Sequence, residues 1–218
     1  MHAIEDHKRI IALLKHEVVP AMGCTEPVAV ALCAARAAEL LGTLPERVKV
    51  ELSMNVLKNA MGVGIPGTGM IGLPIAIFLG MGIGKSSYGL EVLKDNHAQA
   101  VEEGKQYIEE GRISIALDEN APDGLYIKVH AEGDGRTSEA IICGEHTRFI
   151  YEAIDDEVLR KEDVKARASE EHDEPTLTMS KIYDFVTQTP IEEISFIEDS
   201  ATMNMAAAEQ SLKACYGH

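Results

Sequence analysis

The sequence has no tryptophan, and aromatic side chains make up only 5% of its 218 residues. Basic residues are also scarce: 20 Lys and Arg stand against 36 Asp and Glu, which gives a formal net charge of −16. Nucleic acids and anionic membrane surfaces are bound by clustered positive charge. The charge balance therefore argues against both as partners.

Cysteine is sparse, and its spacing offers no disulfide framework. The four cysteines are Cys24, Cys33, Cys143 and Cys215. None forms a C-x-x-C pair. Charged residues at Asp6 and Lys8 interrupt the start of the chain, so we expect no secretory signal there. Because disulfides belong to oxidising compartments, we expect a cytoplasmic protein whose thiols are free or bind metal.

Long apolar runs are missing as well. The stretch that comes closest to a long apolar run is residues 58–85, which contain eight glycines and two prolines. This stretch could be a cofactor loop, a membrane segment or a packed turn at a substrate site. A bilayer requires about 20 apolar residues, and only residues 70–79 are densely apolar. That length favours a buried helix over a membrane span.

A cofactor loop also fits poorly. Gly62, Gly64 and Gly67 have G-x-G-x-x-G spacing, but a lone match is weak and no second βαβ unit follows. A Walker loop ending at Lys85 would need a glycine where Leu79 stands. We therefore expect no NAD.

The remaining explanation is a tight turn that leads into a buried helix. We expect the turn at residues 65–69 and the helix at about 70–79, with Thr68 or Gly69 as its cap. The free N–H groups of such a helix end suit a substrate carboxylate. Three further glycines are better explained by close helix packing: Gly72, Gly80 and Gly82.

Periodicity and turn residues predict an α+β fold. Helices are expected at residues 4–19, 25–41, 87–94 and 96–110. Strands are expected at residues 48–54, 113–117, 125–131, 139–143 and 147–153. Helices followed by consecutive strands indicate two packed layers, with a mixed or antiparallel sheet of four or five strands.

Acidic residues are concentrated in the last third of the chain. Residues 151–218 hold 16 acidic and 6 basic side chains, and residues 156–176 are charged with little periodicity. We expect an α+β domain at 1–155, a linker at 156–176 and the start of an all-helical domain at 177–218. Helices in that last segment are expected at 179–187 and 191–216.

Two positions have chemistry that the residues alone leave open. Thr25 is the expected N-cap of the Ala-rich helix, so Cys24 lies just before a helix N-terminus, where the dipole favours a thiolate. The alternative is a buried, inert thiol. His146 lies between two strands, and its position alone is better explained by a surface residue than by an acid or base.

A short polar segment precedes the glycine-rich stretch. Asn55, Lys58 and Asn59 provide two amides and an ammonium group, which can hold an amino acid and its carboxylate. A solvated loop is the alternative. We favour a binding role because the segment lies close in sequence to residues 66–69.

Four motifs together resemble a known family. They are GCTEP at 23–27, NVLKN at 55–59, PGTG at 66–69 and GEHT at 144–147. With these motifs the chain resembles the N-terminal half of the L-cysteine desulfidase family, relatives of the iron–sulfur L-serine dehydratases. The resemblance runs in order over essentially all 218 residues.

The resemblance implies a β-elimination that uses no pyridoxal phosphate. A [4Fe–4S] cluster acts as Lewis acid, an α-proton is removed, and sulfide or water leaves, so that L-cysteine or L-serine becomes pyruvate and ammonia. By the same resemblance Cys24 is a metal ligand and, with Lys58 and His146, a catalytic residue. The implied substrate-binding residues are Thr25, Glu26, Asn55, Asn59, Gly67, Thr68, Gly69 and Thr147.

The chain also departs from that family. Family members are about twice as long, and Cys33, Cys143 and Cys215 do not fall where further cluster ligands are expected. We therefore expect the N-terminal part of an iron–sulfur amino-acid lyase, inactive alone and without its cluster in this chain. A homo-oligomer is possible, because the last helix has nothing to pack against.

Two other classes of function stay open. An amino-acid-binding or regulatory module would be stabilised by L-cysteine or L-serine and would turn over neither. A pure interaction domain would show neither effect.

Overall fold

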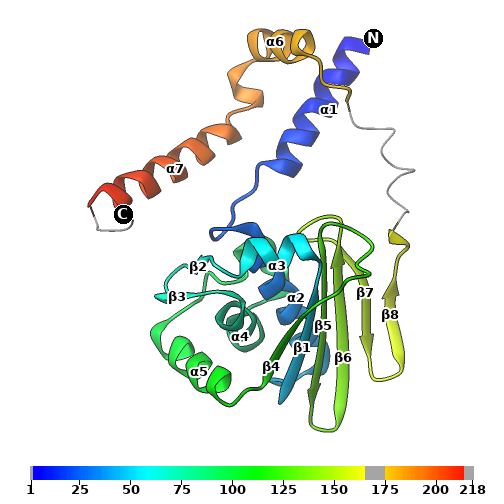
Figure 1. The fold of residues 1–218 in the computed structure, drawn as a ribbon. Coiled ribbons are helices and arrows are strands. Elements are labelled where there is room, and N and C mark those ends of the chain that lie inside the picture. The colour runs from blue at the N-terminus through cyan, green and yellow to red at the C-terminus, as the bar shows by residue number, and fades with distance from the viewer. Residues whose placement is uncertain (1, 165–174, 214–218) are drawn as a thin grey trace. The chain divides into compact units, whose positions relative to one another are not determined.

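The computed structural model describes residues 2–164 and 175–213 (Figure 1). The chain forms two compact units: residues 21–166, here called the sheet unit, and residues 1–20 with 167–218, here called the helical unit. The first helix thus belongs to the helical unit and not, as expected, to the domain with the sheet. Residues 165–174 of the expected linker and residues 214–216 at the end of the expected last helix lie outside the described residues.

The sheet unit confirms the α+β class. Its helical segments are α2 (Thr25–Leu41), α3 (Met54–Ala60), α4 (Leu73–Ile83), η1 (Ser86–Glu91) and α5 (Ala98–Glu109). Its strands are β1 (Arg47–Leu52), β2 (Gly64–Ile65), β3 (Met70–Ile71), β4 (Ile113–Leu117), β5 (Tyr126–Gly133), β6 (Arg136–Cys143), β7 (Phe149–Ile154) and β8 (Glu157–Lys161). Six strands form one mixed sheet in the order β4-β1-β5-β6-β7-β8, in which β1 and β4 are parallel and the other neighbours antiparallel.

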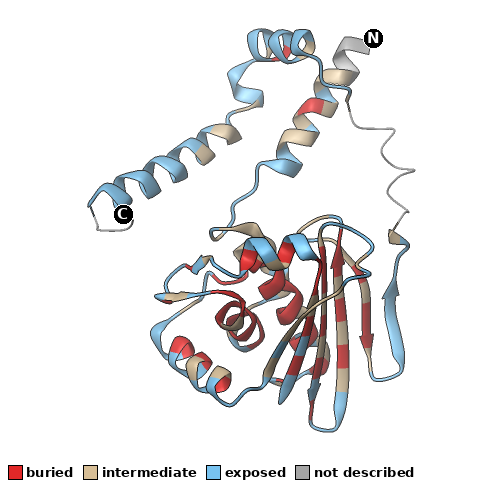
Figure 2. Cartoon of the chain, viewed as in Figure 1, coloured by how far each residue is buried: buried red, intermediate tan, exposed pale blue. Residues whose placement is uncertain are grey.

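The core lies between this sheet and helices α2 and α4, which Figure 1 shows on one side of the strands. Twelve of the seventeen residues of α2 are buried, so the helix is surrounded by protein along most of its length (Figure 2). Helix α4 crosses it so closely that a Cβ on Gly80 would overlap the carbonyl oxygen of Ala31. The packing role expected for Gly80 is thus confirmed.

The other two glycines of that group differ from Gly80. Gly82 is exposed, and a Cβ there would make ordinary contacts at 3.5 Å with Phe78. Gly72 is needed for its backbone, because its φ of 91° is a conformation that other residues rarely adopt. Gly72 also permits close packing, because a Cβ there would lie 2.9 Å from the carbonyl oxygen of Met61, the C-cap of α3.

The sheet has one strand more than expected. Strand β8 occupies residues that the sequence analysis assigned to the charged linker. Its five residues are all exposed, so the two-residue alternation that reveals a half-buried strand is missing. The turn before it depends on Asp155, which adopts a positive φ of 50°.

The glycine-rich stretch also differs from expectation. Thr68 and Gly69 cap no helix: they lie in the turn of a small hairpin formed by β2 and β3. Helix α4 begins at Leu73, and its N-cap is Gly72. The helix end proposed for a carboxylate therefore does not lie at the PGTG turn.

The helical unit consists of α1 (His2–Glu17), α6 (Met179–Gln188), η4 (Ile191–Glu193) and α7 (Phe196–Lys213). Helix α1 meets α6 where the ring of His7 lies 5.1 Å from that of Phe185 and Lys181 pairs with Asp6 at 2.8 Å. In the described part of the chain, no helix has the length and apolar content needed to cross a bilayer.

Candidate functional site

The site begins at the first turn of α2. Cys24 is the N-cap residue, with extended backbone angles, and Thr25 is the first helical residue. The sequence analysis had assigned the cap to Thr25. Glu26 follows in the first turn, where the helix dipole favours an acidic side chain.

Three side chains converge on the carboxylate of Glu26. The Cys24 thiol donates to Oε2 at 3.0 Å, and the Thr25 hydroxyl donates to the same oxygen at 3.3 Å. The side-chain amide of Asn59 donates to Oε1 at 3.1 Å. The bond between Glu26 and Asn59, which are 33 residues apart, thus joins the GCTEP and NVLKN motifs.

These contacts set the protonation of the pair. Burial, followed by the hydrogen bond to Glu26, raises the pKa of Cys24. The hydrogen bond from Cys24 lowers the pKa of Glu26, and Asn59 and the charge of His146 lower it further. The arrangement therefore favours a neutral thiol that donates to a carboxylate, not the thiolate expected from the helix dipole alone.

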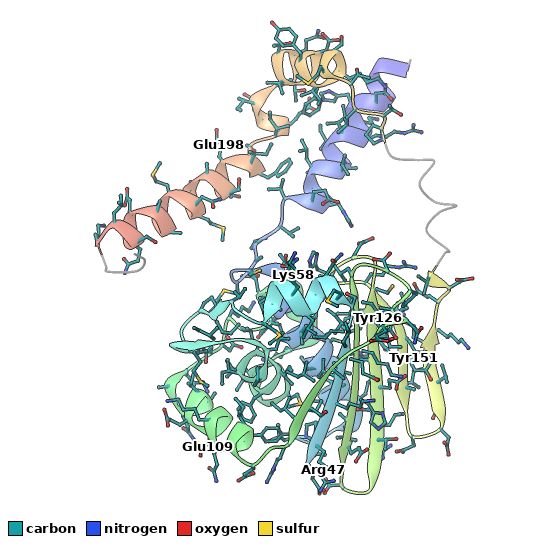
Figure 3. All side chains as sticks on the ribbon, viewed as in Figure 1. Arg47, Lys58, Glu109, Tyr126, Tyr151 and Glu198 are labelled. Atoms are coloured by element: carbon teal, nitrogen blue, oxygen red, sulfur yellow. The ribbon has the colours of Figure 1, made fainter. Side chains whose placement is uncertain are left out.

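The NVLKN segment is helical, not the loop considered as an alternative. Asn55, Lys58 and Asn59 lie on α3 and are exposed. One turn apart, Asn55 and Asn59 share a face of this helix. Figure 3 shows Lys58 on α3 at the end of the sheet unit opposite Arg47.

The glycine-rich turn adjoins the same helix start. A Cβ on Gly23 would lie 3.2 Å from Cγ of Pro66, so the PGTG turn packs beside Cys24. The Thr68 side chain is buried, donates to the Ile65 carbonyl at 2.7 Å and accepts from the Met70 N–H at 2.9 Å. Its hydroxyl therefore holds the turn together.

The other two residues of the turn differ in their surroundings. Gly69 has a φ of 65° and open space around it. Gly67 lies against Asn96, whose amide donates to the Pro66 carbonyl at 3.1 Å. The Asn96 Oδ1 atom is buried and has no hydrogen-bond partner among the described residues. Sequence reasoning missed Asn96, because it belongs to no motif.

His146 and Thr147 lie in the turn between β6 and β7. His146 is half-buried and Thr147 is exposed. The charge of His146 acts on Glu26, which brings the GEHT motif within electrostatic range of the carboxylate. The structure thus gathers Cys24, Glu26, Asn59 and His146, while Thr68 faces inward.

The donors at this site do not suffice for an iron–sulfur cluster, which needs three or four cysteine thiolates. Cys33 lies nine residues along α2 and donates to the Ala140 carbonyl at 3.3 Å in the core. Cys143 is buried against Tyr126 and Ile150. Within residues 2–164 and 175–213, no three His, Cys, Asp or Glu side chains form a group that could hold a metal ion.

Two cavities open elsewhere on the sheet unit. One of about 540 Å³ is lined by Asn55 together with Asp118 and Asp123. Another of about 770 Å³ lies at the start of β1, where Arg47, Lys49 and Arg112 are matched by three glutamates. The mixed charge of the second cavity favours no single class of ligand.

Comparison with known proteins gives relatives but no activity. The chain is 56% identical over 218 residues to a UPF0597 protein of Phocaeicola vulgatus, covering 100% of this chain and 51% of the relative. It is 53% identical over 213 residues to a UPF0597 protein of Bacteroides thetaiotaomicron, covering 98% of this chain and 50% of the relative. It is 45% identical over 207 residues to a UPF0597 protein of Aeromonas hydrophila, covering 93% of this chain and 47% of the relative.

Those names state no substrate or reaction. No family model matches the chain. No solved structure matches it either. The close homologues of the chain are thus UPF0597 proteins, and it spans about half the length of the curated relatives that it matches.

Proposed function

We propose that the start of α2, α3 and the β6–β7 turn form one wall of an amino-acid site in a lyase that acts on L-cysteine or L-serine without pyridoxal phosphate. The observation that carries the proposal is the convergence of Cys24, Thr25 and Asn59 on the Glu26 carboxylate. A carboxylate surrounded by donors at a helix start is a preorganised acceptor for an α-ammonium group.

The reaction would be a β-elimination. One α-proton and the β-substituent leave, aminoacrylate forms, and water converts it to pyruvate and ammonia. L-Cysteine and water thus give pyruvate, ammonia and hydrogen sulfide. In the [4Fe–4S] enzymes that the sequence resembles, the cluster supplies the Lewis acid that stabilises the leaving group. Here the remaining ligands would have to come from outside the described residues.

Each side chain of this wall has a defined task in the proposal. Glu26 binds the α-ammonium group, and Lys58 on the exposed face of α3 binds the α-carboxylate. His146 in its neutral form accepts the α-proton, a role that imidazole side chains often have in general acid–base catalysis. Cys24 holds the Glu26 carboxylate in place until substrate arrives.

The test is pyruvate formation under anaerobic conditions. This chain is produced alone and co-expressed with the part of the Phocaeicola vulgatus relative that it does not match, and each sample receives L-cysteine or L-serine. We expect no pyruvate from the chain alone and pyruvate from the co-expressed pair. Glu26→Gln should lower the rate about 10-fold or more, because a hydrogen bond to a charged group contributes about 1.5–3 kcal/mol.

Glu109→Gln is the matched control. Glu109 is an exposed glutamate on α5, far from Lys58 in Figure 3. Its substitution should leave the rate unchanged. The lyase proposal would be refuted if the co-expressed pair makes no pyruvate. It would also be refuted if Glu26→Gln leaves the rate of pyruvate formation unchanged. Stabilisation by L-serine without turnover would instead favour the amino-acid-binding module.

A further inference from the structure

The helical unit has an apolar stripe that none of its own described residues cover. On α6 the stripe consists of Met179, Ile182, Tyr183 and Val186, spaced i, i+3, i+4 and i+7. All four are exposed, from 40% for Ile182 to 81% for Met179. This spacing is the pattern of a helix that buries one face against a partner.

The stripe is distinct from the contact that α6 already makes. The side chains of α6 that line the cavity against α1 are Lys181, Asp184, Phe185 and Gln188. With about 100° of rotation per residue, the centre of that set lies roughly opposite the centre of the apolar stripe. Helix α6 therefore presents one face to α1 and a second, apolar face to the outside.

Helix α7 also carries an apolar strip. None of its eighteen residues is buried. Ala201, Met205, Ala208 and Leu212 alternate four and three residues apart, which places them within one narrow strip of the helix surface. Small residues between larger ones let a neighbouring helix approach closely. A strip of this kind is the mark of a helix–helix interface.

We propose that the apolar stripes of α6 and α7 dock the remaining half of the family's polypeptide, the part of each UPF0597 relative that this chain does not match. These relatives are about twice as long as this chain, so a partner segment of comparable size exists in the same polypeptide. In those relatives, covalent attachment gives that segment a high effective concentration at the stripe.

Charge argues against a second copy of this chain as the occupant. Residues 175–213 carry six acidic and two basic side chains. Two copies that meet through α6 and α7 would bring these acidic surfaces together, which costs affinity.

The experiment uses this chain and the unmatched part of the Phocaeicola vulgatus relative, produced separately and mixed. We expect a one-to-one complex in size-exclusion chromatography with light scattering. Hydrogen exchange at residues 179–188 and 196–213 should be fast in the chain alone and slower by on the order of 100-fold in the complex, since short helices without packing open readily.

A paired substitution tests the stripe itself. Ile182→Glu combined with Val186→Glu should raise the Kd of the complex about tenfold or more, because apolar anchors dominate such interfaces. The control is Val158→Glu combined with Leu159→Glu on β8, which are similarly exposed at 50% and 51% and lie in the sheet unit. The control should leave the Kd unchanged. Unaltered exchange at β5 and β6 verifies that the control variant folds, and unaltered exchange at α1, which contacts α6, verifies that the stripe variant folds.

Four outcomes would overturn the inference: no complex; a complex that the paired substitution does not weaken; a dimer of the chain alone that the substitution dissociates; or stripe amides already protected in the chain alone. Either of the first two outcomes would show that the remaining half does not bind the stripe. A dimer would show that a second copy of the chain binds it, and protected amides would show that the chain's own sheet unit covers it. The inference is independent of the proposed lyase, because a complex that forms no pyruvate would refute the lyase alone.

Discussion

The thiol of Cys24 donates a hydrogen bond to the Glu26 carboxylate at 3.0 Å across the first turn of α2. The other oxygen of this carboxylate accepts from Asn59 on α3. Glu26 therefore ties the cap of one helix to the face of another, and any group that binds there must replace or join these donors. The proposed amino-acid site depends on this geometry.

Two glycines of α4 should respond in opposite ways to alanine. Gly80→Ala should destabilise the protein by about 1–3 kcal/mol or more, because its Cβ would overlap the Ala31 carbonyl oxygen of the neighbouring helix. Gly82→Ala should stabilise it by about 0.5–1 kcal/mol, because Gly82 has room and alanine favours the helix. Urea unfolding measures the change in the free energy of unfolding for each variant. Equal changes in the two variants would contradict the close approach of α2 and α4.

An ion pair anchors α2 to the sheet. Arg36 donates to Glu152 at 2.7 Å, and Glu152 is buried on β7. Arg36→Met should cost about 1.5–3 kcal/mol, because it removes a charge-assisted hydrogen bond from a buried carboxylate. Lys105→Met, which breaks an exposed pair with Glu102, should cost less than about 0.5 kcal/mol. If urea unfolding shows that both variants lose the same free energy of unfolding, the pair of Arg36 and Glu152 does not anchor the helix.

The turn into β8 should make stability depend on pH. Hydrogen bonds from the Thr137 N–H and then from Arg136 lower the pKa of Asp155. A lowered native pKa means that the unfolded chain binds more protons, so this contribution is present at neutral pH. It should fade as pH falls below about 4, the ordinary pKa of Asp, and vanish below the native pKa.

Asp155→Asn isolates this contribution, because asparagine also tolerates the positive φ of residue 155. The urea midpoint of the wild type should exceed that of the variant at pH 7, and the two should converge in acid. A difference that stays constant with pH would show that the carboxylate charge contributes nothing at this turn.

Most of the sheet unit could be predicted from local pattern. Ile113–Leu117 alternates and ends at turn residues, and the helix expected at 25–41 ends before Gly42, a glycine with a φ of 82°. Strand β8 was missed because it buries nothing, and α3 was missed because its seven residues are too short to show a helical period. The sequence pattern does not predict an element that buries no side chains or that is too short to show a period.

The candidate site was predictable only in part. The motifs named Cys24, Glu26 and Asn59, but no spacing predicts a contact between side chains 33 residues apart. Thr68 was expected to bind substrate, but its hydroxyl makes hydrogen bonds to backbone groups of its own turn. The PGTG sequence alone does not predict these bonds. Asn96 was missed because only the fold brings it to Gly67.

The most direct test of the proposed site is the alkylation rate of Cys24, measured by iodoacetamide labelling and peptide mass spectrometry on the chain alone and on the co-expressed pair. L-Serine should slow the labelling of Cys24 severalfold and D-serine should not, while the buried thiol of Cys33 stays unlabelled throughout. Equal rates with L-serine, D-serine and no ligand in both samples would contradict an amino-acid site at Cys24 and Glu26.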